Sequence, residues 1–320
     1  MKALSLALAL TVATAGGAFA ESYPSRPIAL IVPFAAGGGT DLTARILAER
    51  MRTALGQPII VENIVGAGGA TGVGRAVHAA ADGYTIVIGH WGTHVANGAI
   101  HALRYDLIED FEPISLIAKT RWFVIAKKDF AAKDLLGLIA WSKTSPLRFG
   151  TGGMGSPEHV SGLFFASRTG ARLQFVPYRG GGPALQDLLA GHIDMMIAAS
   201  TIALPYVKEG LVKAYAITDE SRLAEASDIP TVDEAGVPGL YFSSWHGLWA
   251  PKGTPKEVIE RLNAAVREAL AESLVAKRLL DLGQEVFPPD QLTPETLRAH
   301  QTAEIEKWWP VIRAANIKVE

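Results

Sequence analysis

Short apolar runs alternate with helical patterns along most of the chain, and the first pair is the clearest. Residues 28–32 form a continuous apolar run without helical spacing, which predicts a buried strand. Thr40 and Asp41 are typical of a helix start, and apolar residues then recur at helical spacing over 42–51. Glycines at 37–39 supply the turn between the two elements.

This strand, glycine loop and helix together predict a place where an anion can bind. The first N–H groups of a helix have no partner inside the helix, and they lie at the positive end of its dipole. A carboxylate can therefore bind there without a charged side chain. The same pattern also fits a tight strand-to-helix connection that binds nothing.

The alternation continues and predicts an α/β fold with mostly parallel sheets. Further strands are expected at residues 58–61, 85–89, 148–150, 192–197 and 212–217. Helices are expected from the glycine-rich turn 66–72 to about residue 81, at 134–142, 184–190 and 202–208, and over nearly all of the chain beyond residue 255. In such sheets ligands bind outside the carboxyl ends of the strands, where the glycine loops also lie.

The second half of the chain repeats the opening pattern. The strand 148–150 leads into a glycine loop, and Ser156 followed by Pro157 is a typical N-cap with proline at the first helical position. A third glycine loop at 178–183 precedes the helix expected at 184–190. Each half therefore carries at least one candidate anion site.

Composition and charge narrow the class of protein. The 320 residues, 49% of them hydrophobic, exceed the usual limit of a single core and predict two domains. Lys2, the apolar stretch after it and the A-x-A sequence at 18–20 predict a secretory signal peptide over residues 1–20, cleaved after Ala20. Its removal changes the net charge from −2 to −3, because Lys2 is its only charged side chain, and such a balance gives no basic face for nucleic acid. The absence of cysteine excludes disulfides, thiol catalysis and a thiolate metal site.

Three histidines follow the strand expected at 85–89, and they raise the question of a metal site. His90 and His94 could share one face of a helix and bind a metal, with His101 further on. Gly92 lies between the first two, however, and no acidic residue occurs nearby before residue 106. We expect a loop at 90–94 whose side chains face a cleft, and no metal; a periplasmic metal-binding protein is kept as an alternative.

Enzyme motifs are weak in this sequence. The glycines of 150–155 match the dinucleotide fingerprint, but the expected acidic residue about twenty positions on is missing, and 174–177 stands there instead. No nucleophile elbow, H-E-x-x-H pair or phosphate P-loop occurs. Asp41, Asp194 and His159 could form an acid–base set after folding, although nothing in their spacing demands it. We expect no enzyme and no cofactor, with a periplasmic enzyme acting on an organic acid as the alternative.

A set of short motifs spread over the chain resembles one family of transport proteins. The motifs are Tyr23-Pro24-x-x-Pro27-Ile28, Ile31-Val32-Pro33-Phe34-x-x-Gly37-Gly38-x-x-Asp41, Gly56-Gln57-Pro58, Val61-Glu62-Asn63, Gly66-Ala67-Gly68-Gly69, Asp82-Gly83-Tyr84-Thr85, Val176-Pro177-Tyr178, Ala184-Leu185-x-Asp187-Leu188-Leu189, Gly191-x-Ile193-Asp194, Pro230-Thr231 and Trp249-Ala250-Pro251. Together they resemble the solute-binding proteins of tripartite tricarboxylate transporters, the Bug family, over essentially the whole chain beyond the signal peptide.

The resemblance implies a fold, a location and a partner. The fold would be a two-domain periplasmic-binding-protein (Venus flytrap) fold, with each domain a mostly parallel sheet flanked by helices. Domain 1 would comprise residues 21–122 plus 247–320 and domain 2 residues 123–246, with the chain crossing near 121–126 and 242–249. The protein would be a periplasmic monomer that delivers a small organic acid to the membrane components of a transporter.

The residues and the resemblance agree on how the ligand would bind. The loop 34–41 in one domain and 151–156 in the other would face each other across a cleft, and a C4–C8 dicarboxylate could bridge them. Many relatives have an acidic residue where this chain has Ala198-Ala199, which disfavours an amino acid as ligand; an aromatic carboxylate is an alternative. The expected ligand-binding residues are Phe34, Ala36, Gly37, Gly38, Thr40, Asp41, His90, Trp91, Thr93, Thr151, Gly152, Met154, Gly155, Ser156, His159, Tyr178 and Ala198.

Overall fold

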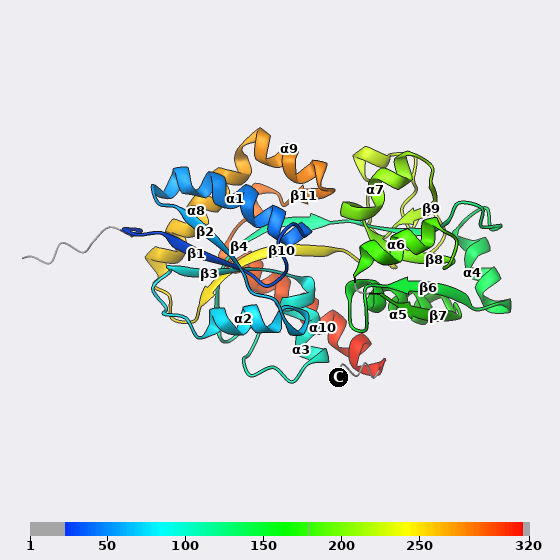
Figure 1. The fold of residues 1–320 in the computed structure, drawn as a ribbon, viewed down its shortest axis with the longest axis horizontal. Helices are drawn as coiled ribbons and strands as arrows, with labels where there is room; N and C mark the ends of the chain where they lie inside the picture. The colour runs from blue at the N-terminus through cyan, green and yellow to red at the C-terminus, as the bar shows by residue number, and fades with distance from the viewer. Residues whose placement is uncertain (1–22, 179, 316–320) are drawn as a thin grey trace, which may run out of the picture.

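The computed structural model describes residues 23–178 and 180–315. They form two lobes, each built around one β-sheet (Figure 1). The signal peptide expected at 1–20 lies outside the described residues, as does Arg179 in the third glycine loop. No helix in the described part of the chain is long and apolar enough to cross a membrane.

The first lobe is built on a six-stranded sheet. Its strands lie in the order β11 (Gln284–Val286), β4 (Phe111–Thr120), β10 (Ser244–Pro251), β3 (Thr85–His90), β1 (Ile28–Val32) and β2 (Ile59–Asn63). The α-helices of this lobe are α1 (Gly39–Leu55), α2 (Ala70–Val77), α3 (Asn97–Ile100), α8 (Lys256–Ala271), α9 (Ser273–Asp281) and α10 (Pro294–Ala314). Strand β1 is parallel to β2 and β3, whereas β10 is antiparallel to β3 and β4.

The second lobe is built on a five-stranded sheet. Its strands lie in the order β7 (Leu173–Pro177), β6 (Leu147–Thr151), β8 (Met195–Ala199), β5 (Trp122–Lys127) and β9 (Val212–Ile217). Its helices are α4 (Leu135–Thr144), α5 (Pro157–Thr169), α6 (Gly181–Leu189) and α7 (Ser200–Lys208). Strand β6 is parallel to β7 and β8, and β5 is antiparallel to β8 and β9.

Both sheets are therefore mixed, which corrects the expectation of mostly parallel sheets. The antiparallel strands include the ones that enter or leave a lobe at the chain crossings, β4, β5 and β10. A parallel neighbour needs a crossover connection that returns the chain to the same end of the sheet. A strand that arrives directly from the other lobe has no such connection, and it can pair in the antiparallel direction.

Several local predictions are confirmed and four are wrong. Strands β1 and β9 have the predicted bounds, and Ser156 caps α5 by accepting the N–H of His159 at 3.2 Å. Helix α2 ends at Val77 and β8 begins only at residue 195, later than predicted. The C-terminal region also contains the strand β11.

The segment after β3 is the fourth error, because it is helical rather than a loop. Residues Gly92–Ala96 form a turn of π-helix that continues into α3. The segment is helical despite Gly92 because the residues on either side of it, Trp91 and Thr93, are fully buried. Packing thus overrides the weak helix propensity of glycine here.

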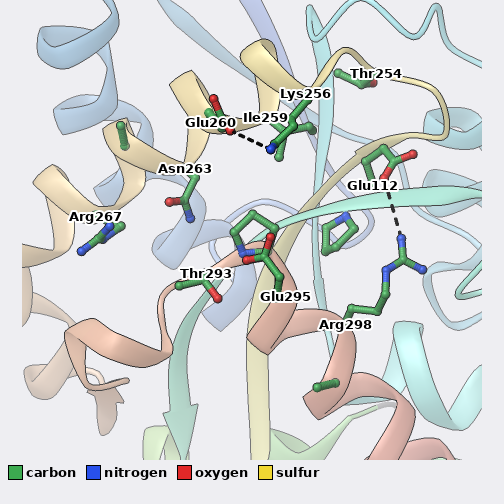
Figure 2. Close-up of a pocket in the computed structure, with 14 residues that line it drawn as sticks. Glu112, Thr254, Lys256, Ile259, Glu260, Asn263, Arg267, Thr293, Glu295 and Arg298 are labelled. Atoms are coloured by element: carbon green, nitrogen blue, oxygen red, sulfur yellow. Dashed lines mark ion pairs between the residues drawn. The ribbon is translucent and has the colours of Figure 1, made fainter.

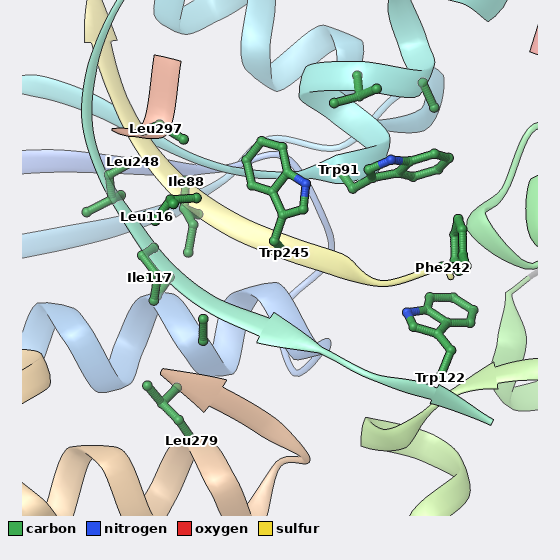
Figure 3. Close-up of a cluster of buried hydrophobic side chains, with 14 of the residues drawn as sticks. Ile88, Trp91, Leu116, Ile117, Trp122, Phe242, Trp245, Leu248, Leu279 and Leu297 are labelled. Atoms are coloured by element: carbon green, nitrogen blue, oxygen red, sulfur yellow. The ribbon is translucent and has the colours of Figure 1, made fainter. Parts of the chain in front are cut away.

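An aromatic cluster fills the region where the chain crosses between lobes (Figure 3). Trp91 lies edge-on to Phe242, with ring centroids 5.2 Å apart, and to Trp308 at 5.5 Å. Trp122 contacts the other side of Phe242 at 5.0 Å. Such edge-to-face contacts add to the hydrophobic gain of burying large rings. The cluster fixes the crossing segments, and Trp308 of α10 packs within it.

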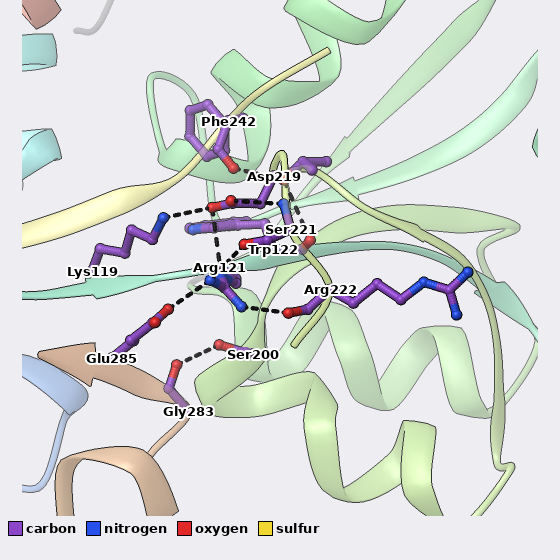
Figure 4. A network of polar contacts seen from close by, with 11 residues as sticks. Lys119, Arg121, Trp122, Ser200, Asp219, Ser221, Arg222, Phe242, Gly283 and Glu285 are labelled. Carbon is purple, nitrogen blue, oxygen red and sulfur yellow. Dashed lines mark hydrogen bonds and ion pairs between the residues drawn. The ribbon is translucent and has the colours of Figure 1, made fainter. Parts of the chain in front are cut away.

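Polar contacts also join the lobes at the crossing (Figure 4). Arg121 lies between β4 and β5, is 7% exposed, and pairs with Glu285 of the first lobe at 2.7 Å. Its guanidinium also lies 3.6 Å from Asp219 of the second lobe. The Ser200 hydroxyl donates to the Gly283 carbonyl at 2.6 Å, which ties the start of α7 to the turn before β11. These contacts hold the carboxyl ends of strands from both sheets around one cavity.

Candidate ligand-binding site

A cavity of about 260 Å³ lies between the two lobes. Its first-lobe walls come from the start of α1, the ends of β3 and β4, and the starts of β10 and β11. Its second-lobe walls come from the first turns of α5, α6 and α7. The lining residues are Gly39, Thr40, His90, Thr120, Trp122, Pro157, Glu158, Gly181, Gly182, Ala199, Thr201, Ile202, Ser244, His246 and Gln284.

The first-lobe wall is centred on the N-terminus of α1. Gly38 is the N-cap, and no side chain bonds to the helix start from that position. The N–H groups of Gly39 and Thr40 have no partner among the described residues. Thr40 also places its hydroxyl 3.1 Å from His246 Nε2. Two backbone donors, a hydroxyl and the positive end of the helix dipole therefore meet here, which suits an anion.

Asp41 holds the loop that leads into this helix. Its carboxylate accepts the Gly37 N–H at 2.8 Å and the Asn63 amide at 2.9 Å. Arg45, one turn further on, pairs with it at 2.9 Å. The hydrogen bonds from Arg45 lower the pKa of Asp41 to about 2, so the carboxyl is ionised at neutral pH. Asp41 lies in the buried interior of the loop and does not line the cavity, and we assign it a positioning role.

The second-lobe wall brings together three helix N-termini. Helix α6 starts with Gly181 and Gly182, whose N–H groups have no partner among the residues described. Beside them lie Thr201 and Ile202 in the first turn of α7. Glycine at 182 leaves open space, since a methyl group there would meet no atom within 4 Å. The wall is thus a second anion-receptive surface opposite α1.

Glu158 in the first turn of α5 gives this wall its one acidic side chain among the described lining residues. It is 8% exposed, and its carboxyl lies between Gly152 and Gly181. A methyl group on Gly181 would come within 2.5 Å of Glu158 Oε1. Burial raises the pKa of Glu158, which favours the protonated form. A protonated carboxyl can donate a hydrogen bond to an anion, whereas an ionised one would repel it.

The floor of the cavity is a row of polar side chains along the edge of the first sheet. Gln284 of β11, Thr120 of β4 and Ser244 of β10 lie side by side, because Thr120 pairs with both of the other two. His246 pairs with His90 in the same way. Burial lowers the pKa of His246 to about 3 and that of His90 to about 4, so both imidazoles are neutral. No lysine or arginine lines the cavity within the described residues.

The structure brings together only part of the residue set expected from the sequence. Thr40 and His90 line the cavity, and Phe34 stacks on His90 with ring centroids 4.7 Å apart. Ala36, Gly37 and Gly38 form the exposed loop that precedes α1.

Gly152 lies behind Glu158, and the rest of its loop stands beside the cavity instead of lining it. Ser156 is occupied as the α5 cap, and His159 Nδ1 accepts the Gly155 N–H at 3.1 Å. Thr151 is 1% exposed, and Met154 is 51% exposed on the outside. The loop therefore shapes the start of α5, and the first turn of that helix reaches the cavity in its place.

Four expected contacts need correction. Trp91 and Thr93 are fully buried, Trp91 in the aromatic cluster and Thr93 through hydrogen bonds to the His90 backbone. Ala198 is fully buried in the core of the second lobe. Tyr178 donates its hydroxyl to Asp187 at 2.7 Å and does not line the cavity.

Among the lining residues that sequence reasoning missed are Glu158, His246 and Gln284. Glu158 follows the N-cap and proline that the sequence did identify, so the first helical turn itself was the available signal. His246 lies in a tryptophan-rich run read only as a connection between domains. Gln284 belongs to a strand hidden in a region that looks helical throughout, and no local signal could have found it.

Larger hollows lie elsewhere on the first lobe, and the largest described is about 910 Å³ between α8, α10 and β4 (Figure 2). Several of its polar side chains have protein partners: Arg298 faces Glu112 at 3.7 Å, and the Asn263 amide donates to two backbone carbonyls. The part of the chain described here contains no group of three or more His, Asp or Glu side chains arranged for a metal ion. The cavity between the lobes is therefore the best-formed candidate site.

Comparison with known proteins gives one consistent result. The family model of the tripartite tricarboxylate transporter family receptor (TctC) matches residues 43–317. The chain is 34% identical to Protein BugT of Bordetella pertussis, over an alignment covering 100% of this chain and 99% of that protein.

Solved structures agree with the sequence relatives. MatC from Rhodopseudomonas palustris, solved with bound malate, is 40% identical, covers 91% of this chain and 100% of its own, and has a TM-score of 0.81. Another R. palustris protein, solved with adipate, is 32% identical and covers 92% of this chain and 99% of its own, with a TM-score of 0.82. The two-sheet architecture and the sequence therefore match the same group of related proteins.

Proposed function

The chain belongs to the TctC/Bug family of solute-binding proteins, and on this premise we propose that it captures a C4–C8 dicarboxylate and delivers it to the membrane components of a tripartite tricarboxylate-type transporter. The proposed place of action is the periplasm, reached by means of the signal peptide expected at residues 1–20, and the proposed state is a monomer. The proposal includes binding without turnover.

One observation carries the choice of ligand: helix N-termini stand on both walls of a cavity with no cationic side chain in its described lining. A carboxylate at the start of α1 would meet the N–H groups of Gly39 and Thr40. A second carboxylate would meet Gly181 and Gly182 at the start of α6, with Thr201 of α7 beside them. Fixed dipoles on both sides favour a ligand with an anionic group at each end.

Such a ligand also explains why the lobes would close around it. Each lobe alone offers one anion site. A single ligand molecule can occupy both sites only when the two lobes are closed on each other. A ligand shifts a conformational equilibrium by its differential affinity for the two states, and the second carboxylate supplies that difference. We propose that the two lobes are the moving domains, close to the expected residues 21–122 with 247–320, and 123–246. The strands shift these expected bounds slightly, because Trp122 begins a strand of the second lobe and 244–246 belong to a strand of the first.

The cavity size and the relatives support a small acid. At about 260 Å³ the cavity is smaller than typical sites for drug-sized ligands. MatC and the adipate-bound relative carry a four-carbon and a six-carbon dicarboxylate in structures that share this fold. Glu158 fits the same ligand, because burial favours its protonated form, and a protonated carboxyl can donate to a carboxylate.

A thermal-shift screen over an organic-acid library tests this proposal. We expect C4–C8 dicarboxylates to raise the melting temperature, because a ligand that binds only the folded protein at about 100 times its dissociation constant adds roughly 2.7 kcal/mol of stability. Amines, sugars and amino acids serve as the negative set. Stabilisation by amino acids or aromatic acids, with no effect of aliphatic dicarboxylates, would contradict the proposed ligand class.

A further inference from the structure

Gln284 is the one amide side chain among the described residues that line the cavity, and only one of its two polar atoms has a hydrogen-bond partner. It is 1% exposed, and Thr43 of α1 donates its hydroxyl to Gln284 Oε1 at 2.9 Å. The other amide atom, Nε2, has no hydrogen-bond partner among the described residues. A buried polar group without a partner is costly, and a ligand group that pairs with it would recover that cost.

The position of Gln284 relative to α1 is fixed by the same contact. The Thr43 hydroxyl also lies 2.9 Å from the Gly39 carbonyl, and Gly39 is the first residue of the helix. Gln284 therefore stands next to the helix start where one ligand carboxylate is proposed to bind. A substituent on the carbon beside that carboxylate would be the nearest part of the ligand to the amide.

From this geometry we infer that Gln284 is a specificity-determining residue that recognises a hydroxyl group on the carbon next to a ligand carboxylate. The inference rests on the proposed dicarboxylate function and narrows it to 2-hydroxy dicarboxylates. Gln284 Nε2 donates to the ligand hydroxyl oxygen, and the hydroxyls of Thr120 and Ser244 lie next to it in the floor row.

A hydroxyl is the substituent that fits this amide in either orientation. The single hydroxyl proton of Thr43 can serve Gly39 or Gln284, and Thr43 can instead accept from the amide if the amide turns over. The cavity then faces either a donor or an acceptor. A ligand hydroxyl donates and accepts, so it matches both, whereas a methylene matches neither and leaves the amide without a partner.

The size of the preference follows from the cost of an unsatisfied buried amide. Sites built to hydrogen-bond a ligand group reject analogues that lack it more strongly than apolar pockets reject an added methylene. The ligand hydroxyl gains a hydrogen bond of ordinary strength and removes the cost of the unpaired amide. Together these correspond to roughly tenfold to hundredfold tighter binding of the hydroxylated acid. The amide is fixed on one side of the ligand, so the preference should hold for one enantiomer.

Titration calorimetry with matched ligand pairs tests the inference. The pairs are succinate with each enantiomer of malate, and adipate with each enantiomer of 2-hydroxyadipate. The proteins are the parent, Gln284→Met, and the matched control Gln291→Met, which changes an exposed glutamine that does not line the cavity. Thr43→Val is a second variant, since it keeps Gln284 but removes the hydroxyl that holds it.

We expect the parent and Gln291→Met to bind one hydroxylated enantiomer of at least one pair about tenfold or more tighter than its unsubstituted partner. Gln284→Met should bring that ratio to within about threefold, and Thr43→Val should lower it partly. An unchanged ratio in both variants, or no preference in the parent, overturns the inference. If the hydroxylated and unsubstituted dicarboxylates bind equally well, only this inference fails. If no dicarboxylate binds at all, the proposed function fails with it.

Discussion

The Asp41→Asn substitution tests how the loop before α1 is held. It keeps the size and shape of the side chain and removes its charge. The carboxylate fixes the loop through the Gly37 N–H, the Asn63 amide and the Arg45 guanidinium, at 2.8 to 2.9 Å. The asparagine can still accept the Gly37 N–H, but it loses the ion pair with Arg45 and presents an N–H₂ group where two donors converge.

The pKa of Asp41 gives the magnitude. Its folded value of about 2 lies below the ordinary 3.8, so the ionised form favours the folded state. At 1.36 kcal/mol per pKa unit, this corresponds to about 2 kcal/mol of stability at neutral pH. Because the folded pKa is the lower one, the contribution is complete above the unfolded pKa near 4. It is lost as the pH falls through that value towards 2.

Urea unfolding followed by tryptophan fluorescence measures both effects. At pH 7 we expect Asp41→Asn to lower the free energy of unfolding by about 2 kcal/mol. Between pH 4 and pH 2 the parent should lose more stability than the variant by about the same amount. Asp290→Asn, at an exposed position, is the control. Equal stability of parent and variant at pH 7, or identical pH dependence of the two, would refute the account of the loop.

Three further substitutions separate ligand contacts from structural roles, each measured by titration calorimetry beside thermal melts. Thr40→Ala should weaken dicarboxylate binding by about 1–2 kcal/mol, because it removes a hydroxyl beside the proposed carboxylate position; unchanged affinity would remove Thr40 from the site. Ser156→Ala should lower stability by about 1 kcal/mol and change affinity by less than about 0.5 kcal/mol, since its hydroxyl caps α5; a large loss of affinity would reverse that assignment. Gly181→Ala should weaken binding about tenfold or more, because the methyl group would lie 2.5 Å from Glu158 Oε1 and crowd the start of α6; parent-like binding would place the second anchor elsewhere.

The sequence predicted the local elements well wherever the signal is short-range. Strand β1 and the Ser156 cap of α5 follow from hydrophobic runs, proline and capping residues within a few positions. The glycine loops were recognised because glycine marks tight turns. The fold class followed from the alternation of elements together with the family resemblance.

The candidate site was predicted only in part, because its contacts are long-range. His246 meets Thr40 across 206 positions of sequence, and Gln284 meets Thr43 across 241. Trp91 stands next to His90 in the chain, yet it points into the aromatic cluster while His90 lines the cavity. Consecutive side chains point in different directions, and no spacing rule in the sequence says which of them faces the ligand.

The central claim is that one ligand bridges the helix N-termini of both lobes, and it is tested most directly by removing one ligand charge. Titration calorimetry should compare succinate, glutarate, adipate and suberate, each beside its monomethyl ester. Loss of one charge-assisted anchor predicts roughly tenfold to hundredfold weaker binding of the ester of the tightest acid. An ester that binds as tightly as its parent diacid would contradict the claim, because one of the two walls would then hold no carboxylate.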